Sequence, residues 1–195
     1  MSTHEAVRHA SGLSISGSRS FELNTYAAIR PSLLFTNSYV SVKSNKDGYA
    51  TIGNYDNKIF ALGAQTNFKL YSDAFWSVFL GLYRGLGSSS LDLDKSAPTT
   101  FIQYSSHGLR GDFKQVELGT SFSLAKSKLT LNLAAVGSFY EIDLSRSKGD
   151  YLEEKQLEGE VFLTKGNASA IDQGLDTRIL QKILSLRLGL AMSFY

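Results

Sequence analysis

The chain has 195 residues, a formal net charge of +2 and 19% charged residues. This length suits one domain, and the nearly balanced charge argues against a nucleic-acid-binding surface. Because the sequence contains no cysteine, disulfides and thiolate metal sites are excluded, and we expect no metal or other cofactor. Pro is scarce, whereas Gly, Tyr and Phe are frequent, which favours strands and tight turns over helices.

The first part of the chain predicts a terminal segment followed by strands. Residues 1–10 contain no apolar run, and we expect a disordered or truncated N-terminal segment there, followed by a single β-domain over residues 11–195. A weak alternating segment begins near Gly12, and Asn24 marks a tight turn. The next strand has apolar residues at every second position, namely Ile29, Pro31, Leu33 and Phe35.

Five more segments of the chain have the same two-residue period, which is typical of strands with one apolar face. Their apolar positions are Phe60, Leu62, Ala64, Phe68 and Leu70; Trp76, Val78, Leu80 and Leu82; Val116, Leu118, Phe122 and Leu124; Leu129, Leu131, Leu133 and Ala135; and Leu184, Leu186, Leu188, Leu190, Met192 and Phe194. The sequence therefore predicts about seven or eight strands.

The predicted connections alternate in length along the chain. Tight turns are expected at Asn24, Tyr71–Ala74 and Ala125–Lys128, and long polar loops at residues 44–57, 87–112 and 145–177. Bacterial transmembrane barrels have this asymmetry, with short periplasmic turns and long outer loops. The segment from Glu154 to Lys165 could be another strand, but a crossing there would invert the pattern, so we place it in the last loop as a hairpin.

The polar face of the predicted strands favours a membrane protein. It is rich in Gly, Ser, Asn, Gln and Thr, as a crowded or wet lumen would be, while the apolar face would contact lipid. We therefore predict an all-β, antiparallel up-and-down transmembrane β-barrel. Leucines such as Leu118, Leu133 and Leu188 are expected to face lipid. The residues expected to face the lumen are Gln65, Asn67, Lys69, Asn132 and Arg187.

The last strand resembles the C-terminal β-signal through which outer-membrane barrels are recognised by the barrel assembly machinery. The matching positions are Arg187, Gly189, Met192 and Phe194, which follow the spacing polar, Gly, hydrophobic, aromatic. One residue, Tyr195, follows the aromatic residue that usually ends this signal. The resemblance implies an outer membrane of a Gram-negative bacterium as the location.

The order and spacing of the strands resemble the C-terminal β-domain of autotransporters, the type V secretion translocators. The likeness covers residues 11–145 and 180–194 and includes "LLFTNSYVSVKSNKDGY" and "VELGTSFSLAKSKLTLNLAAVGSFY". That family has a twelve-stranded barrel, so the chain resembles its C-terminal part or a smaller relative. The resemblance implies membrane anchoring, cell-surface display and secretion of an N-terminal passenger that this chain does not contain.

Two other functions are compatible with the sequence. One is a small outer-membrane adhesin or structural barrel whose loops bind a host or lipopolysaccharide, and the other is a soluble, lipocalin-like binding barrel. We do not expect an enzyme, although Ser105, Ser106, His107 and Asp112 lie close together in sequence. The Arg-Gly-Asp tripeptide at residues 110–112 is expected in a turn that joins a loop to a strand.

Overall fold

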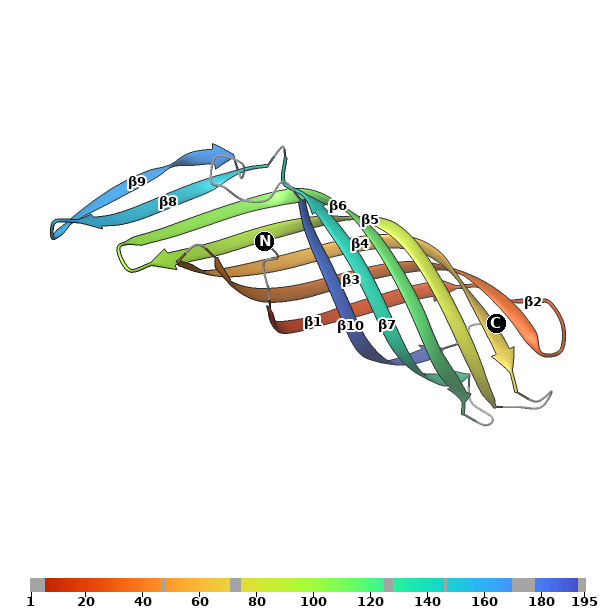
Figure 1. The fold of residues 1–195 in the computed structure, drawn as a ribbon. Helices are drawn as coiled ribbons and strands as arrows, with labels where there is room; N and C mark the ends of the chain where they lie inside the picture. Colours follow the sequence, from red (N-terminus) through yellow and green to blue (C-terminus); the bar gives the residue numbers. More distant parts are fainter. Residues whose placement is uncertain are drawn as a thin grey trace.

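The computed structural model describes residues 6–46, 48–70, 75–124, 128–145, 147–169 and 178–192, which contain no helix. They form one antiparallel sheet (Figure 1). Its strands are β1 (Ala6–Ser18), β2 (Phe21–Glu22), β3 (Ala27–Lys46), β4 (Tyr49–Lys69), β5 (Trp76–Ala97), β6 (Thr100–Ser123), β7 (Leu129–Asp143), β8 (Lys148–Leu157), β9 (Glu160–Ser169) and β10 (Arg178–Met192). The prediction of an all-β, up-and-down fold is confirmed.

The sheet is open. Its main path runs β1-β3-β4-β5-β6-β7-β10, and each neighbouring pair is antiparallel. β1 and β10 therefore run in the same direction, and they do not pair with each other among the described residues. The seven strands of this path agree with the number that the sequence predicts, but a closed barrel is not confirmed.

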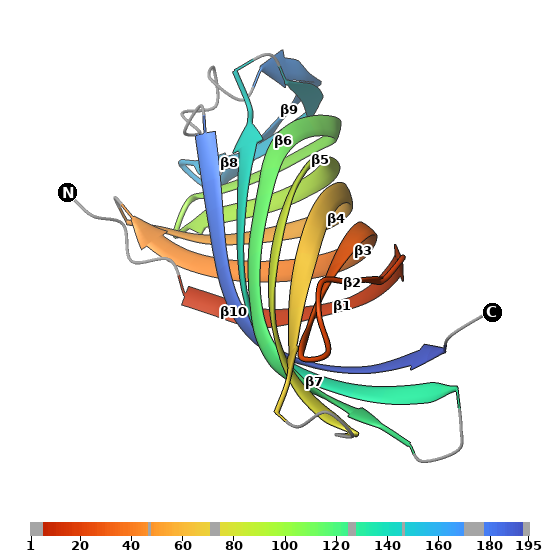
Figure 2. The same ribbon diagram turned by 90° about the vertical axis from the view of Figure 1, so that its right-hand side faces the viewer.

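The sheet nevertheless curls around a common interior (Figure 2). A hollow of about 420 Å³ is lined by Ser14 from one edge strand and Ser185 from the other. Across this interior, the Asn57 Nδ2 atom on β4 donates a hydrogen bond of 3.0 Å to Gln181 Oε1 on β10. The Ser89 hydroxyl on β5 lies 2.7 Å from Asn57 Oδ1 and 3.0 Å from the Tyr140 hydroxyl on β7. These buried contacts connect four strands across the concave face.

The strands β8 and β9 continue the sheet at one end. β6 pairs with β7 through residues 111–123 and with β8 through residues 100–105. The β8–β9 hairpin turns at Glu158 and Gly159, whose φ values of 52° and 87° are those that a two-residue type I′ turn requires. The hairpin predicted between Glu154 and Lys165 is confirmed.

The predictions of long loops at residues 44–57 and 87–112 are wrong, because strands occupy most of those residues. β3 and β4 remain paired up to Lys46 and Tyr49, and β5 and β6 up to Ala97 and Thr100. A bulge near Gly108 (φ 69°) shifts the register without ending β6. These strand extensions form because their concave positions bury apolar residues, namely Val40, Tyr55, Leu91, Leu93, Tyr104 and Leu109.

The predicted turns are only partly described. The Asn24 turn is confirmed: Asn24 Oδ1 accepts hydrogen bonds of 2.8 Å from the backbone N–H groups of Tyr26 and Ala27. Residues 71–74 and 125–127 lie outside the described residues, as do residues 170–177 of the last predicted loop. At the N-terminus, β1 begins at Ala6, so residues 6–10 of the expected terminal segment belong to a strand.

The concave face holds an apolar core. Its larger cluster consists of Leu34, Val40, Tyr55, Ile59, Ala61, Tyr83, Leu91, Leu93, Tyr104, Leu109, Phe113, Tyr140, Ile142 and Leu144, and a smaller one of Phe79, Ala134 and Val136. Most of the larger cluster lies on parts of the strands beyond the segments that the sequence predicts as membrane strands. Along those predicted segments the concave positions are mostly small or polar, as expected of a lumen, and the buried ones include Asn67, Gln115, Glu117 and Ser121.

Glycines allow the strands to curve closely around this core. A Cβ atom at Gly85 on β5 would collide with the Phe60 carbonyl oxygen and lie 2.7 Å from Ala61 Cβ on β4. At Gly137 on β7, the space around the same position is empty to 4 Å. The β4 backbone cannot move away from an added Cβ atom as a flexible side chain can. We therefore infer that Gly85 is required for the close approach of β4 and β5.

We therefore expect Gly85→Ala to lower the free energy of unfolding by about 2 kcal/mol, as overpacking of a filled interior does. Gly137→Ala is the matched control and should change it by less than about 0.5 kcal/mol. Urea titration followed by the fluorescence of Trp76, the single tryptophan, would measure both. Equal effects of the two substitutions would contradict the proposed role of Gly85.

Candidate functional site

The convex face carries a band of exposed apolar side chains that the core does not use. It crosses every strand of the main path, and on β10 Leu184, Leu186 and Leu188 are 85%, 81% and 72% exposed. Other members are Leu13, Ile15, Ile29, Leu33, Phe35, Phe60, Leu62, Phe68, Leu80, Leu82, Val116, Leu118, Leu131, Leu133, Leu190 and Met192. Monomeric soluble proteins rarely expose a continuous apolar surface of this kind.

The band lies obliquely across the strands. On β3 it covers residues 27–35, whereas on β10 it covers residues 184–192. When the pairing register is followed from β3 across β4–β7 to β10, Leu33 aligns with Lys182. Lys182 lies two residues before the band begins on β10 at Leu184. The band therefore shifts along the strand direction from one strand to the next, as a level belt does on a sheet of tilted strands. Each crossing is close to the ~9–11 residues that a tilted membrane strand needs.

The band ends abruptly on the convex face of β4, β5 and β6. Beyond Phe60, Leu86 and Val116 the outward positions of these strands are largely polar, and they include Asp56, Ser90, Asp92, Asp94 and Gln103. Tyr39 continues this polar surface through a 2.9 Å hydrogen bond from its hydroxyl to Asn54 Oδ1. The same strands thus have an apolar outer face over one half and a polar outer face over the other.

The structure places the five residues expected in the lumen on the concave face. The Gln65 and Asn67 amides lie 2.8 Å apart. Asn132 Oδ1 accepts a 2.7 Å hydrogen bond from Ser121, and Lys69 Nζ lies 3.7 Å from Glu22 Oε1. The fifth residue, Arg187, forms an ion pair with Glu117.

The Arg187–Glu117 pair belongs to a small polar cluster between β6, β7 and β10. Arg187 Nη1 contacts Glu117 Oε1, which also accepts a 2.6 Å hydrogen bond from Gln115 Nε2. Ser138 Oγ donates to Gln115 Oε1 at 3.1 Å. Glu117 is only 4% exposed, so this carboxylate depends on Arg187 and Gln115 for the compensation that water would otherwise supply.

The residues expected to form an assembly signal lie on the last strand. Arg187 and Gly189 are on its concave side and Met192, which is 58% exposed, is on its convex side. Phe194 lies outside the described residues. The β10 edge opposite β7 has no pairing strand in the described part of the chain, so its backbone is open to strand addition.

The residues examined for catalysis do not form a Ser–His pair. Ser105 Oγ donates to Asp92 Oδ1 at 2.6 Å, and Ser106 Oγ donates to the Lys148 carbonyl oxygen at 3.0 Å. Within the described ranges, no group of three or more His, Cys, Asp and Glu side chains is arranged to hold a metal ion. No helix long and apolar enough to cross a membrane occurs there either.

The Arg-Gly-Asp tripeptide lies inside β6, not in the turn that we predicted. Arg110 and Asp112 project from the convex face, and Gly111 is buried on the concave face beside Tyr140. Tyr140 is 3% exposed and belongs to the core. By contrast, Trp76 is 41% exposed and stacks on Phe122 at a centroid distance of 5.8 Å.

Comparison of the chain with models of protein families, with curated proteins and with solved structures finds no match.

The buried cluster predicts a strong effect of Arg187. Arg187→Met should lower the free energy of unfolding by about 3 kcal/mol, because it leaves the Glu117 carboxylate buried without its cation. Adding Glu117→Gln should restore most of this loss. The four proteins of this double-mutant cycle can be compared by urea titration, with Lys182→Met on the exposed face of the same strand as the control. Additive losses in the double variant would contradict the coupling.

Proposed function

We propose that this chain is a membrane-embedded β-domain of a bacterial outer membrane whose convex face contacts lipid and which anchors polypeptide at the cell surface. The observation that carries this proposal is the apolar band. Its leucines and phenylalanines are exposed although the concave face already supplies a core. Lipid is the environment in which such a belt of side chains is favourable.

The polar extension of the strands supports the same arrangement. Over residues 37–58 and 88–110, the sheet has an apolar concave face and a polar convex face, which is the pattern of a sheet in water. The β8–β9 hairpin continues this half. We propose that the band lies in the membrane, that this half projects from its outer surface, and that the Asn24 turn faces the periplasm.

The packed interior favours anchoring over conduction by the described strands. Tyr83, Phe113 and Tyr140 pack in the core on the concave face, and the Asn57–Gln181 hydrogen bond crosses the interior. A soluble binding barrel would reverse the arrangement, with an interior ligand cavity and a polar exterior. The autotransporter-type role, with a passenger supplied by further sequence and assembly by the barrel assembly machinery, is our interpretation of the sequence resemblance and forms part of the proposal.

Lipid contact predicts that a charge in the band is costly. Leu118→Arg, at a position 58% exposed, should make folding into phosphatidylcholine vesicles less favourable by ~2–4 kcal/mol. Leu157→Arg, at a position 49% exposed on the β8–β9 hairpin, is the matched control and should cost less than about 1 kcal/mol. Equal losses, or a wild-type chain that stays folded and monomeric without detergent or lipid, would contradict the proposed function.

Recognition of the last strand by the assembly machinery predicts a difference between cells and purified protein. Phe194→Ala should reduce insertion into the outer membrane of cells several-fold, because strand addition needs one register and the aromatic helps to set it. In purified form, where no machinery acts, the variant should refold into detergent micelles as the wild type does. Normal insertion in cells, measured by membrane fractionation and protease accessibility, would rule out the assembly role.

A further inference from the structure

A group of four cations lies where the apolar band ends on the convex face. We call it the cationic boundary; it consists of Lys58 on β4, Arg84 on β5, and Arg110 and Lys114 on β6. Register relates its members: Arg84 pairs with Lys114, while Ser88 pairs with both Lys58 and Arg110. With strands ~4.8 Å apart, the long side chains of Lys58 and Arg110, which flank Ser88, can reach a common headgroup, and Arg84 and Lys114 form a second pair further along the same strands.

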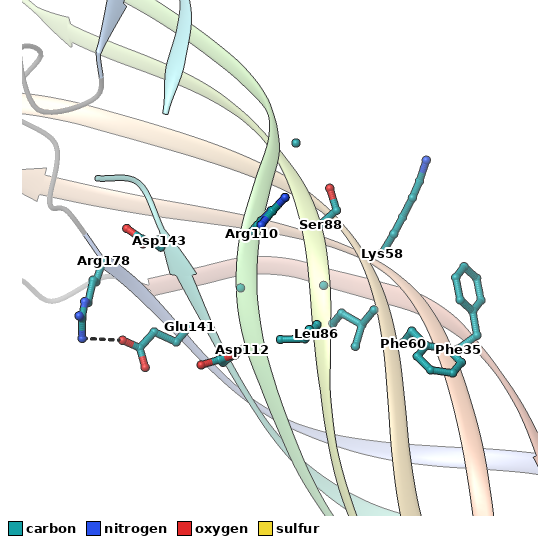
Figure 3. Close-up of a pocket in the computed structure, with 14 residues that line it drawn as sticks. Phe35, Lys58, Phe60, Leu86, Ser88, Arg110, Asp112, Glu141, Asp143 and Arg178 are labelled. Carbon is teal, nitrogen blue, oxygen red and sulfur yellow. Dashed lines mark hydrogen bonds and ion pairs between the residues drawn. The ribbon is translucent and has the colours of Figure 1, made fainter. Parts of the chain in front are cut away.

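The cationic boundary borders an exposed apolar surface. Leu86, which is 69% exposed, lies on β5 between these cations, and its register partner on β4 is Phe60. Phe60 in turn pairs with Phe35, and the two are 54% and 48% exposed. A hollow of about 780 Å³ on this face is lined by these three apolar residues together with Lys58 and Arg110 (Figure 3).

The acidic residues of the same hollow are largely occupied elsewhere. Glu141 forms an ion pair of 3.2 Å with Arg178, and Asp143 Oδ1 accepts a 2.9 Å hydrogen bond from the Ser145 N–H group. Figure 3 shows that pair at the side of the hollow opposite Phe35 and Phe60. Asp112 lies on β6 between Arg110 and Lys114, and Asp56 lies two residues from Lys58 on the outward face of β4, so the four cations of the boundary outnumber the two carboxylates next to them.

From this arrangement we propose that the cationic boundary binds a phosphorylated membrane lipid. Its phosphate lies between Lys58 and Arg110, and an acyl chain lies along Leu86, Phe60 and Phe35. The inference rests on the proposed function, because the apolar residues continue into the band that would contact lipid. A free anion in water would gain nothing from this apolar surface, whereas a lipid satisfies the cations and covers the apolar side chains together.

The test measures lipid retention by the full chain refolded in a neutral maltoside detergent. Protein is incubated with equal amounts of phosphatidylglycerol and phosphatidylcholine that carry identical acyl chains, repurified, and its bound lipids are quantified by mass spectrometry. We expect retention of phosphatidylglycerol over phosphatidylcholine. Since one cation near a lipid headgroup is worth about fivefold in affinity, Lys58→Gln with Arg110→Gln should reduce this preference by about tenfold or more.

The control removes the same charge elsewhere. Lys43 on β3 and Lys155 on β8 are exposed cations of the polar extension, and their double replacement by Gln should leave the preference unchanged. If the first double variant does not fold, as judged by circular dichroism, Arg84→Gln with Lys114→Gln tests the same boundary. An equal loss in the control, or no preference in the wild type, would overturn the proposal.

Two further outcomes separate the alternatives. Displacement of the lipid by millimolar inorganic phosphate would show an anion site that does not recognise lipid, and would overturn the inference. A wild-type chain that inserts into phosphatidylcholine vesicles but retains both lipids equally would refute only the lipid site. A chain that inserts into no vesicle would refute the proposed function itself.

Discussion

The strict alternation of side chains across a pleated strand is the constraint on which the rest of this structure depends. Successive side chains of a strand point to opposite faces of the sheet, and a register shift of one residue would exchange the two sets of side chains. In this chain one set of alternate side chains faces inward along each long strand. On β5, for example, Phe79, Tyr83 and Leu91 all face the core. Whatever happens on the outside must be achieved with the remaining positions.

Those remaining positions change from apolar to polar halfway along the strands. On β5 the outward side chains proceed from Leu80 and Leu82 to Ser88 and Asp92 without any break in pairing. One continuous hydrogen-bonded sheet can therefore serve in hydrocarbon over one half and in water over the other.

The sequence predicts the fold class and the faces of the strands well, because both follow from local alternation. It fails where that alternation is masked by composition. Leu91 and Leu93 were enough to continue β5, but the Ser and Asp residues around them are typical of loops. The side-chain contacts of the site could not be predicted from local alternation. The Arg187–Glu117 pair joins residues 70 positions apart, and the cationic boundary depends on the register of three strands, which no local pattern specifies.

The shared direction of the two edge strands limits how this sheet can be completed. One strand inserted between β1 and β10 could pair antiparallel with both, and so could any odd number, whereas an even number would leave one parallel junction. Two copies in the same membrane orientation would also meet through parallel β1 and β10 edges. Under the proposed membrane location, unpaired backbone groups are costly, so the number of strands that a partner contributes decides whether it can complete the sheet with antiparallel pairs alone.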